Sequence, residues 1–150
     1  MKKIFLVVLL LISSVYAKEI ELTPPPKFEP SPFTWNKWHE YFGIGAVVAG
    51  MVAGATSDDG GDVHKIAGIT GALLADASVI SGLLIHFDDI NLDFGAKDPD
   101  NIHIALGLGG AALYNIAAFT GLNGDVEDSI HAPAGVLGTL MMMTSIYITW

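Results

Sequence analysis

The sequence predicts an all-α membrane protein, an up-and-down four-helix transmembrane bundle built from two similar helical hairpins. Hydrophobic residues make up 51% of the 150-residue chain and charged residues only 15%, well below the charged fraction of a typical soluble domain. Four apolar segments approach the roughly 20 residues that a bilayer requires, at 40–56, 64–87, 102–122 and 131–150. Short, acidic, turn-rich connections separate them, which makes consecutive helices antiparallel.

The first 17 residues, MKKIFLVVLLLISSVYA, have the pattern of a secretory signal peptide. Two lysines precede an apolar stretch from Ile4 to Ile12, and small residues lead up to Ala17, where we expect cleavage. The alternative is an uncleaved N-terminal anchor. Both interpretations leave the lysines in the cytoplasm and put residue 18 outside. We therefore expect a multi-pass protein of a bacterial inner membrane, with the N-terminus of the mature chain outside.

Residues 18–38 form a proline-rich segment between the signal peptide and the helical domain, which we place at 39–150. Five prolines between Pro24 and Pro32 disfavour regular structure and predict an extended extracytoplasmic spacer. The segment is either a simple spacer or a contact strip for a partner.

The helical part contains an internal repeat. GDVHKIAGITGALL at 61–74 and GDVEDSIHAPAGVLGTL at 124–140 share a turn, a histidine and the same small-residue spacing. This similarity predicts a helical hairpin used twice.

Each apolar segment begins at or near a histidine that is followed by glycine four residues later. The histidines are His39, His64, His103 and His131, and the glycines are Gly43, Gly68, Gly107 and Gly135. A further small residue stands seven positions after each histidine, so the small residues share a helical face with the imidazole. Such a face leaves room for a large flat cofactor, and haem fits that description. The alternative is close helix packing, which also uses small residues.

The helix directions then pair the histidines. The first and third helices run the same way, so His39 and His103 lie at the outer end, while His64 and His131 lie at the cytoplasmic end. Two histidines from facing helices can ligate one haem iron from both sides. We therefore expect two haem b groups, because the chain has no Cys for covalent haem attachment. Haem iron held by two histidines has no open position, which favours electron transfer over oxygen chemistry.

The segments WHEYFG, HKIAG, HIALG and HAPAG resemble the four core helices of the cytochrome b561 family. In that family each of four consecutive helices contributes one haem-ligating histidine near its start, and the haems pair the first helix with the third and the second with the fourth. The resemblance covers residues 38–150. Family members usually have two more helices, and the ascorbate-binding members have basic loops, whereas the loops here are acidic. The resemblance therefore implies transmembrane electron transfer without naming the donor.

Several further residues are candidates of second rank. Lys37, Lys65 and Lys97 lie close to the predicted haem ends and are candidates to pair with propionates, Lys65 being the best candidate for the inner haem. His86, at the outer end of the second helix, is either an ordinary interfacial histidine, a propionate partner or a substitute ligand for His39. Asp76 and Asn115 are polar residues in the middle of helices. Asp76 is either a proton relay or a hydrogen-bonding group across the bundle, because an unpaired carboxylate in lipid is costly.

The function we predict is a di-haem b-type cytochrome that carries electrons across or along the membrane. It would act as an electron-transfer subunit or a b561-like transmembrane oxidoreductase. Membrane lipid and a redox partner outside the cytoplasmic membrane are the expected partners, quinol being one candidate, with a homodimer or a larger redox complex as possible assemblies. The net charge of −9 disfavours nucleic acid. The alternative is a non-redox, glycine-rich bundle that anchors a complex or conducts protons or metal ions.

Overall fold

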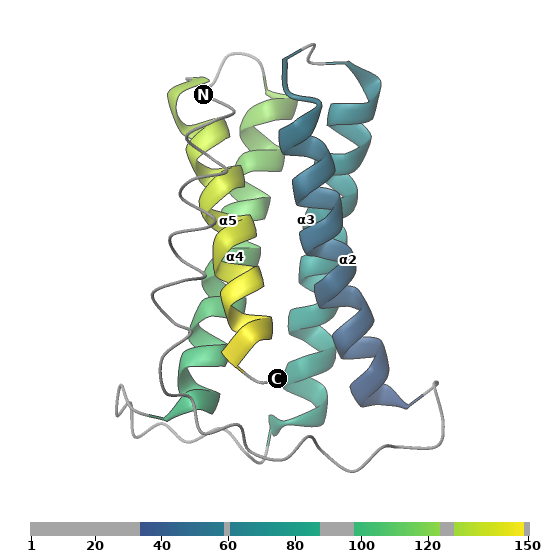
Figure 1. Cartoon of the computed structure of the whole chain (residues 1–150), viewed down its shortest axis with the longest axis vertical. Helices are drawn as coiled ribbons and strands as arrows, with labels where there is room; N and C mark the ends of the chain where they lie inside the picture. Colours follow the sequence, from purple (N-terminus) through teal and green to yellow (C-terminus); the bar gives the residue numbers. More distant parts are fainter. Residues whose placement is uncertain (1–33, 59–60, 88–97, 124–127, 149–150) are drawn as a thin grey trace. The chain divides into compact units, whose positions relative to one another are not determined.

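The computed structural model describes residues 34–58, 61–87, 98–123 and 128–148, which form four α-helices and contain no strand (Figure 1). The helices are α2 (Trp35–Ala55), α3 (Asp62–Ile85), α4 (Pro99–Leu122) and α5 (Asp128–Ile148). The all-α prediction is confirmed for this part of the chain. The predicted signal peptide and residues 18–33 of the predicted spacer lie outside the described residues.

The helices begin a few residues before the apolar segments that predicted them. The Thr34 side chain caps α2 by accepting a hydrogen bond from the Lys37 amide at 3.3 Å. Asp98 caps α4 in the same way, with Pro99 in the first turn. Capping residues start a helix within polar sequence, whereas hydropathy marks only its apolar part. Residues 35–38, assigned above to the spacer, are therefore the first turn of α2.

The four helices form a ring of antiparallel neighbours. Each helix packs against the next one in the chain, and α2 closes the ring against α5. Contacts are most extensive within the pairs α2–α3 and α4–α5, so the bundle consists of two helical hairpins. The hairpins meet along two seams, one between α3 and α4 and the other between α2 and α5.

Small residues bring the two helices of each hairpin into backbone contact. A Cβ added at Gly138 would lie 3.1 Å from the Gly110 carbonyl oxygen, and one at Gly71 would lie 3.6 Å from the Ala46 carbonyl oxygen. These four residues are the ones seven positions after each histidine. At these positions the small residues let the helices of a hairpin approach closely, as the packing alternative expects.

The centre of the bundle is built from small residues around one tyrosine. Tyr114 of α4 is 4% exposed, and its hydroxyl donates to the Ala46 carbonyl of α2 at 3.0 Å. The same hydroxyl lies 3.0 Å from the Thr139 hydroxyl of α5. Tyr114 therefore connects both hairpins at mid-height.

Two of the described helices, α3 and α4, are long and apolar enough to cross a membrane. Large apolar side chains cover much of the outer surface of these helices. Leu73 and Phe119, for example, are 64% and 63% exposed. This composition is compatible with membrane association.

Candidate functional site

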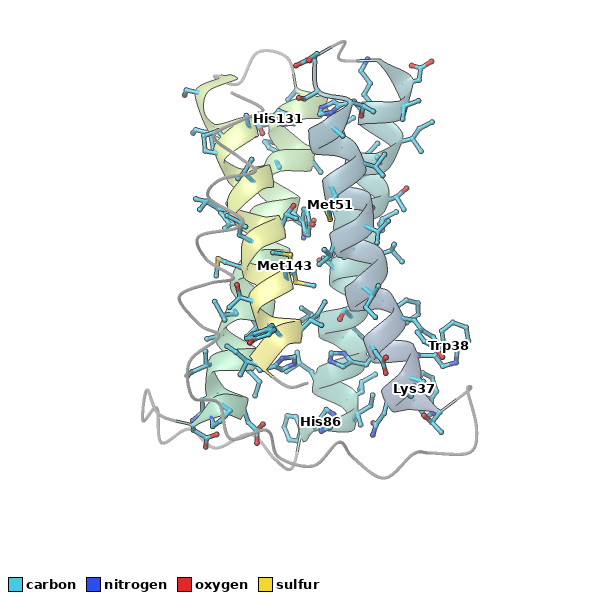
Figure 2. All side chains as sticks on the ribbon, viewed as in Figure 1. Lys37, Trp38, Met51, His86, His131 and Met143 are labelled. Carbon is cyan, nitrogen blue, oxygen red and sulfur yellow. The ribbon has the colours of Figure 1, made fainter. Side chains whose placement is uncertain are left out.

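Each end of the bundle holds two histidines from diagonally opposite helices. His39 of α2 and His103 of α4 lie at one end, with ring centroids 5.9 Å apart. His64 of α3 and His131 of α5 lie at the other end, with centroids 5.6 Å apart (Figure 2). The structure thus brings together the same histidines that the helix directions paired. Each pair spans the interior of the bundle, because its two helices are not neighbours in the ring.

All four histidines are held by a hydrogen bond from Nδ1 to a backbone carbonyl of the other helix in their hairpin. The distances are 2.8–3.0 Å, for His39 to Ser78, His64 to Ala53, His103 to Ser145 and His131 to Ala117. A carbonyl oxygen only accepts, so Nδ1 carries the proton in every ring. Such a bond fixes the ring orientation and raises the basicity of the other nitrogen. The Nε2 lone pair of each ring is therefore the available ligand.

At one end these lone pairs face each other directly. The Nε2 atoms of His64 and His131 lie 3.4 Å apart. With both Nδ1 atoms protonated, neither neutral ring can donate to the other. A proton or a metal ion between the two nitrogens would relieve the repulsion of the lone pairs. Metal–imidazole bonds of about 2.0 Å, as in zinc sites, place two nitrogens about 4 Å apart, so a small outward movement admits a metal.

The anchoring carbonyls follow the repeat. When the sequences of α2 and α4 are aligned at their histidines, Ala53 matches Ala117. When those of α3 and α5 are aligned in the same way, Ser78 matches Ser145. One end of the bundle therefore has serine anchors for its histidines, and the other end has alanine anchors.

The serine hydroxyls add a second contact at the His39–His103 end. Ser145 Oγ lies 2.9 Å from His103 Nδ1 and donates to the His103 carbonyl at 3.0 Å. Ser78 Oγ makes the same contacts with His39 at 3.5 and 3.3 Å. Alanine has no hydroxyl, so the pairs at the two ends have different hydrogen-bonding surroundings.

Three of the four glycines that follow the histidines have loosely packed surroundings. A Cβ at Gly68 would meet no atom within 4 Å, and a Cβ at Gly107 or Gly135 would meet a single atom at 3.6 or 3.8 Å. Gly43 is closer to its neighbours, with Ser78 Oγ at 3.3 Å. The space beside Gly68, Gly107 and Gly135 is of the kind that the edge of a flat macrocycle would occupy.

Two other glycines press directly on histidine rings. A Cβ at Gly82 would lie 2.7 Å from His39 Cε1, and a Cβ at Gly121 would lie 2.7 Å from His131 Cε1. Gly82 stands eighteen positions after His64, and Gly121 stands eighteen positions after His103. Their role is visible only in the structure, where they leave room for the ring of the neighbouring helix.

The residues therefore fit haem in their donor chemistry, and three of the glycines that follow the histidines have open surroundings. Each end supplies two neutral imidazoles with fixed tautomers and with Nε2 as the ligand, and two axial histidines saturate a haem iron. No group of three or more His, Cys, Asp or Glu that could hold a metal ion occurs among the described residues. A haem iron needs only two protein ligands.

The candidates for contact with the propionates are less well supported. Lys65 follows His64 and is exposed at that end. Lys37 forms an ion pair with Glu40 at 2.6 Å. His86 is the exposed residue that follows the last residue of α3, and its ring centroid lies 6.3 Å from that of His39, which places it beside the His39–His103 pair (Figure 2). Lys97 lies outside the described residues.

Asp76 is bonded across a seam between the hairpins. Asn115 Nδ2 of α4 donates to Asp76 Oδ1 of α3 at 2.7 Å, and Asn115 also donates to the Ala111 carbonyl at 3.0 Å. This contact agrees with the structural interpretation of Asp76.

Comparison with protein-family models, with curated proteins and with solved structures found no match. The resemblance to the cytochrome b561 family therefore depends on the four histidine motifs alone.

Proposed function

We propose that the protein is a membrane-embedded di-haem b-type cytochrome. In this proposal all four helices span the bilayer, and His39 with His103 and His64 with His131 each hold one haem. A haem held in this way takes up and releases one electron at its iron. With one site near each membrane surface, the bundle transfers electrons between a donor and an acceptor on opposite sides, or along one side.

The chain's own residues would orient and tune the ligands. The Nδ1 hydrogen bonds to four backbone carbonyls hold the rings in one tautomer. The helices that carry these carbonyls are fixed by the backbone contacts at Gly71 and Gly138. The ligand nitrogens therefore need little rearrangement when the iron changes charge, which favours fast electron transfer.

The observation that carries the proposal is the pair of Nε2 atoms at 3.4 Å. Two histidines that both donate through Nδ1 have no hydrogen bond to offer each other. Ordinary packing gives no reason to bring them into contact inside a bundle. At the other end the rings of His39 and His103 also face each other across the interior, with centroids 5.9 Å apart. Ligation of a shared cofactor gives that reason.

Haem content per chain in single-histidine variants tests the proposal. We expect two haems per chain in the unchanged protein, and one in His103→Ala and in His131→Ala, because each removes one axial ligand of a different site. His86→Ala is the matched control and should keep both haems, as it removes a histidine outside the two pairs. Equal haem content in all three variants would contradict the assignment.

A further inference from the structure

The Tyr114 side chain crosses the interior of the bundle between the two histidine pairs. It starts on α4, and its hydroxyl reaches the Ala46 carbonyl of α2, the diagonally opposite helix, at 3.0 Å. Thr139 of α5, which contacts the same hydroxyl, stands eight residues after His131 and six before Ser145, the anchor of His103. At 1.5 Å per residue these steps are about 12 and 9 Å. The hydroxyl therefore lies between the two ends.

The repeat equivalent of Tyr114 provides the space for this side chain. When α2 and α4 are aligned at their histidines, Tyr114 matches Gly50. A Cβ added at Gly50 would collide with the Tyr114 hydroxyl oxygen and would lie 2.6 Å from Thr139 Oγ1. Two tyrosines could not meet at the centre of an approximately twofold bundle. One repeat therefore supplies the ring, and the other supplies the space for it.

Other buried positions at this level pair a larger residue with a small one in the same way. The pairs are Thr139 with Ala72, Met142 with Ala75 and Val47 with Ala111. Because the smaller member of each pair ends at Cβ or has no side chain, it cannot replace the larger one. Without the Tyr114 ring, the centre of the bundle would be left unfilled.

The hydroxyl groups at this level do not continue into a proton path. The hydrogen of the Tyr114 hydroxyl goes to the Ala46 carbonyl, and the Thr139 hydroxyl donates to the Gly135 carbonyl at 2.9 Å. A carbonyl oxygen accepts a hydrogen bond and has no hydrogen to pass on. Both donors therefore end on the backbone of a helix.

We infer that Tyr114 closes the interior of the bundle to water and protons at mid-height. The inference rests on the membrane-embedded state proposed above, because a barrier has a function only when the two ends face different compartments. A charge in a dry apolar layer is costly, so a proton needs water or a chain of donors to cross it. An electron needs neither. The bundle can then transfer electrons between its ends while it preserves a proton gradient.

Proton permeability of reconstituted vesicles tests the inference. The purified protein is placed in phosphatidylcholine vesicles that contain a pH-sensitive dye, and proton influx is measured after a pH jump with valinomycin and potassium present. Tyr114→Ala leaves the Ala46 carbonyl and the Thr139 hydroxyl facing an open space, and polar groups of this kind hold water. We expect proton influx per chain to rise at least about tenfold, since water lowers the cost of the charge.

Tyr114→Phe is the matched control, because it keeps the ring across the interior and should leave influx at the level of the unchanged protein. Met142→Ala tests for general loosening, since it truncates another buried side chain, one that packs on Gly110 within a hairpin. Unchanged influx in a folded Tyr114→Ala variant would overturn the inference, as would an equal rise in Met142→Ala. If Tyr114→Ala does not fold, Tyr114→Leu replaces it, because leucine is too short to reach the Ala46 carbonyl.

Haem content of the same vesicles separates this inference from the proposed function. A protein that floats with the vesicles, keeps them sealed and holds no haem overturns only the cytochrome. A protein with two haems whose unchanged form already leaks as much as Tyr114→Ala overturns only the barrier.

Discussion

The histidine rings are oriented by backbone rather than by other side chains. Each Nδ1 donates to a carbonyl one helix away, and that carbonyl belongs to serine at one end and alanine at the other. A carbonyl anchor cannot be lost by substitution of a side chain. A substitution can remove the hydroxyl groups of the two anchoring serines, which contact His39 and His103.

We predict that Ser145→Ala raises the reduction potential of the haem at the His39–His103 end and leaves the other potential unchanged. The hydroxyl lies 2.9 Å from His103 Nδ1 and shares its N–H with the Ser145 carbonyl. This second acceptor makes the ring more basic and stabilises the oxidised iron. A potentiometric titration with two resolved waves measures this. Thr144→Ala is the control, because the Thr144 hydroxyl donates to the Leu140 carbonyl of its own helix, which anchors no histidine. A shift of both waves would refute a local effect.

Replacement of Tyr114 tests the central connection between the hairpins. Tyr114→Phe loses the hydrogen bonds to the Ala46 carbonyl and to Thr139. We expect the free energy of unfolding to fall by about 1–3 kcal/mol with haem content unchanged, as measured by denaturation in detergent. Tyr147→Phe, at a 55% exposed position, should have little effect on unfolding. A loss of haem in Tyr114→Phe would instead place that hydroxyl in the cofactor site.

At the scale of the helices, glycine has three separate roles. At Gly138 and Gly71 it permits backbone contact within a hairpin, and at Gly82 it makes room for a histidine ring. At Gly68 the space is open. The sequence pattern puts each of these glycines on the same helical face as the histidine of its own helix. It could not separate the three roles, because the rotation of one helix against the next decides which atoms each glycine contacts.

Alanine substitutions should separate packing from cofactor binding. Gly138→Ala puts a Cβ 3.1 Å from the Gly110 carbonyl and should destabilise the bundle. Gly68→Ala meets no protein atom within 4 Å, so packing alone predicts a stabilisation of about 0.5–1 kcal/mol from the better helix former. The haem proposal predicts that Gly68→Ala lowers haem content at the His64–His131 end. Full haem content together with higher stability would show that no haem occupies the space beside Gly68.

The positions of the four helices could be predicted to within a few residues, since each apolar segment is bounded by turn residues. The grouping of His39 with His103 and of His64 with His131 also followed from alternating helix directions. The carbonyl anchors could not be predicted, because they depend on the register between two helices, which the contacts at Gly71 and Gly138 determine. The sequence identifies Asp76 and Asn115 as polar residues within apolar helices. Their contact could not be predicted, because it depends on the distance between the two hairpins.

At the scale of the whole molecule, the repeat gives an approximate twofold bundle with unequal parts. The two histidine pairs differ in their serine and alanine anchors, and the two seams differ in their polar and methionine residues. The first difference would give the two proposed haems separate potentials.

The most direct test of the central claim is the dithionite-reduced minus oxidised optical spectrum of the full chain, purified from membranes in detergent, with haem quantified per chain. The account predicts a b-type spectrum with two haems per chain. Cells that supply haem freely but yield a colourless protein would contradict it and leave a packed helical bundle without a redox cofactor.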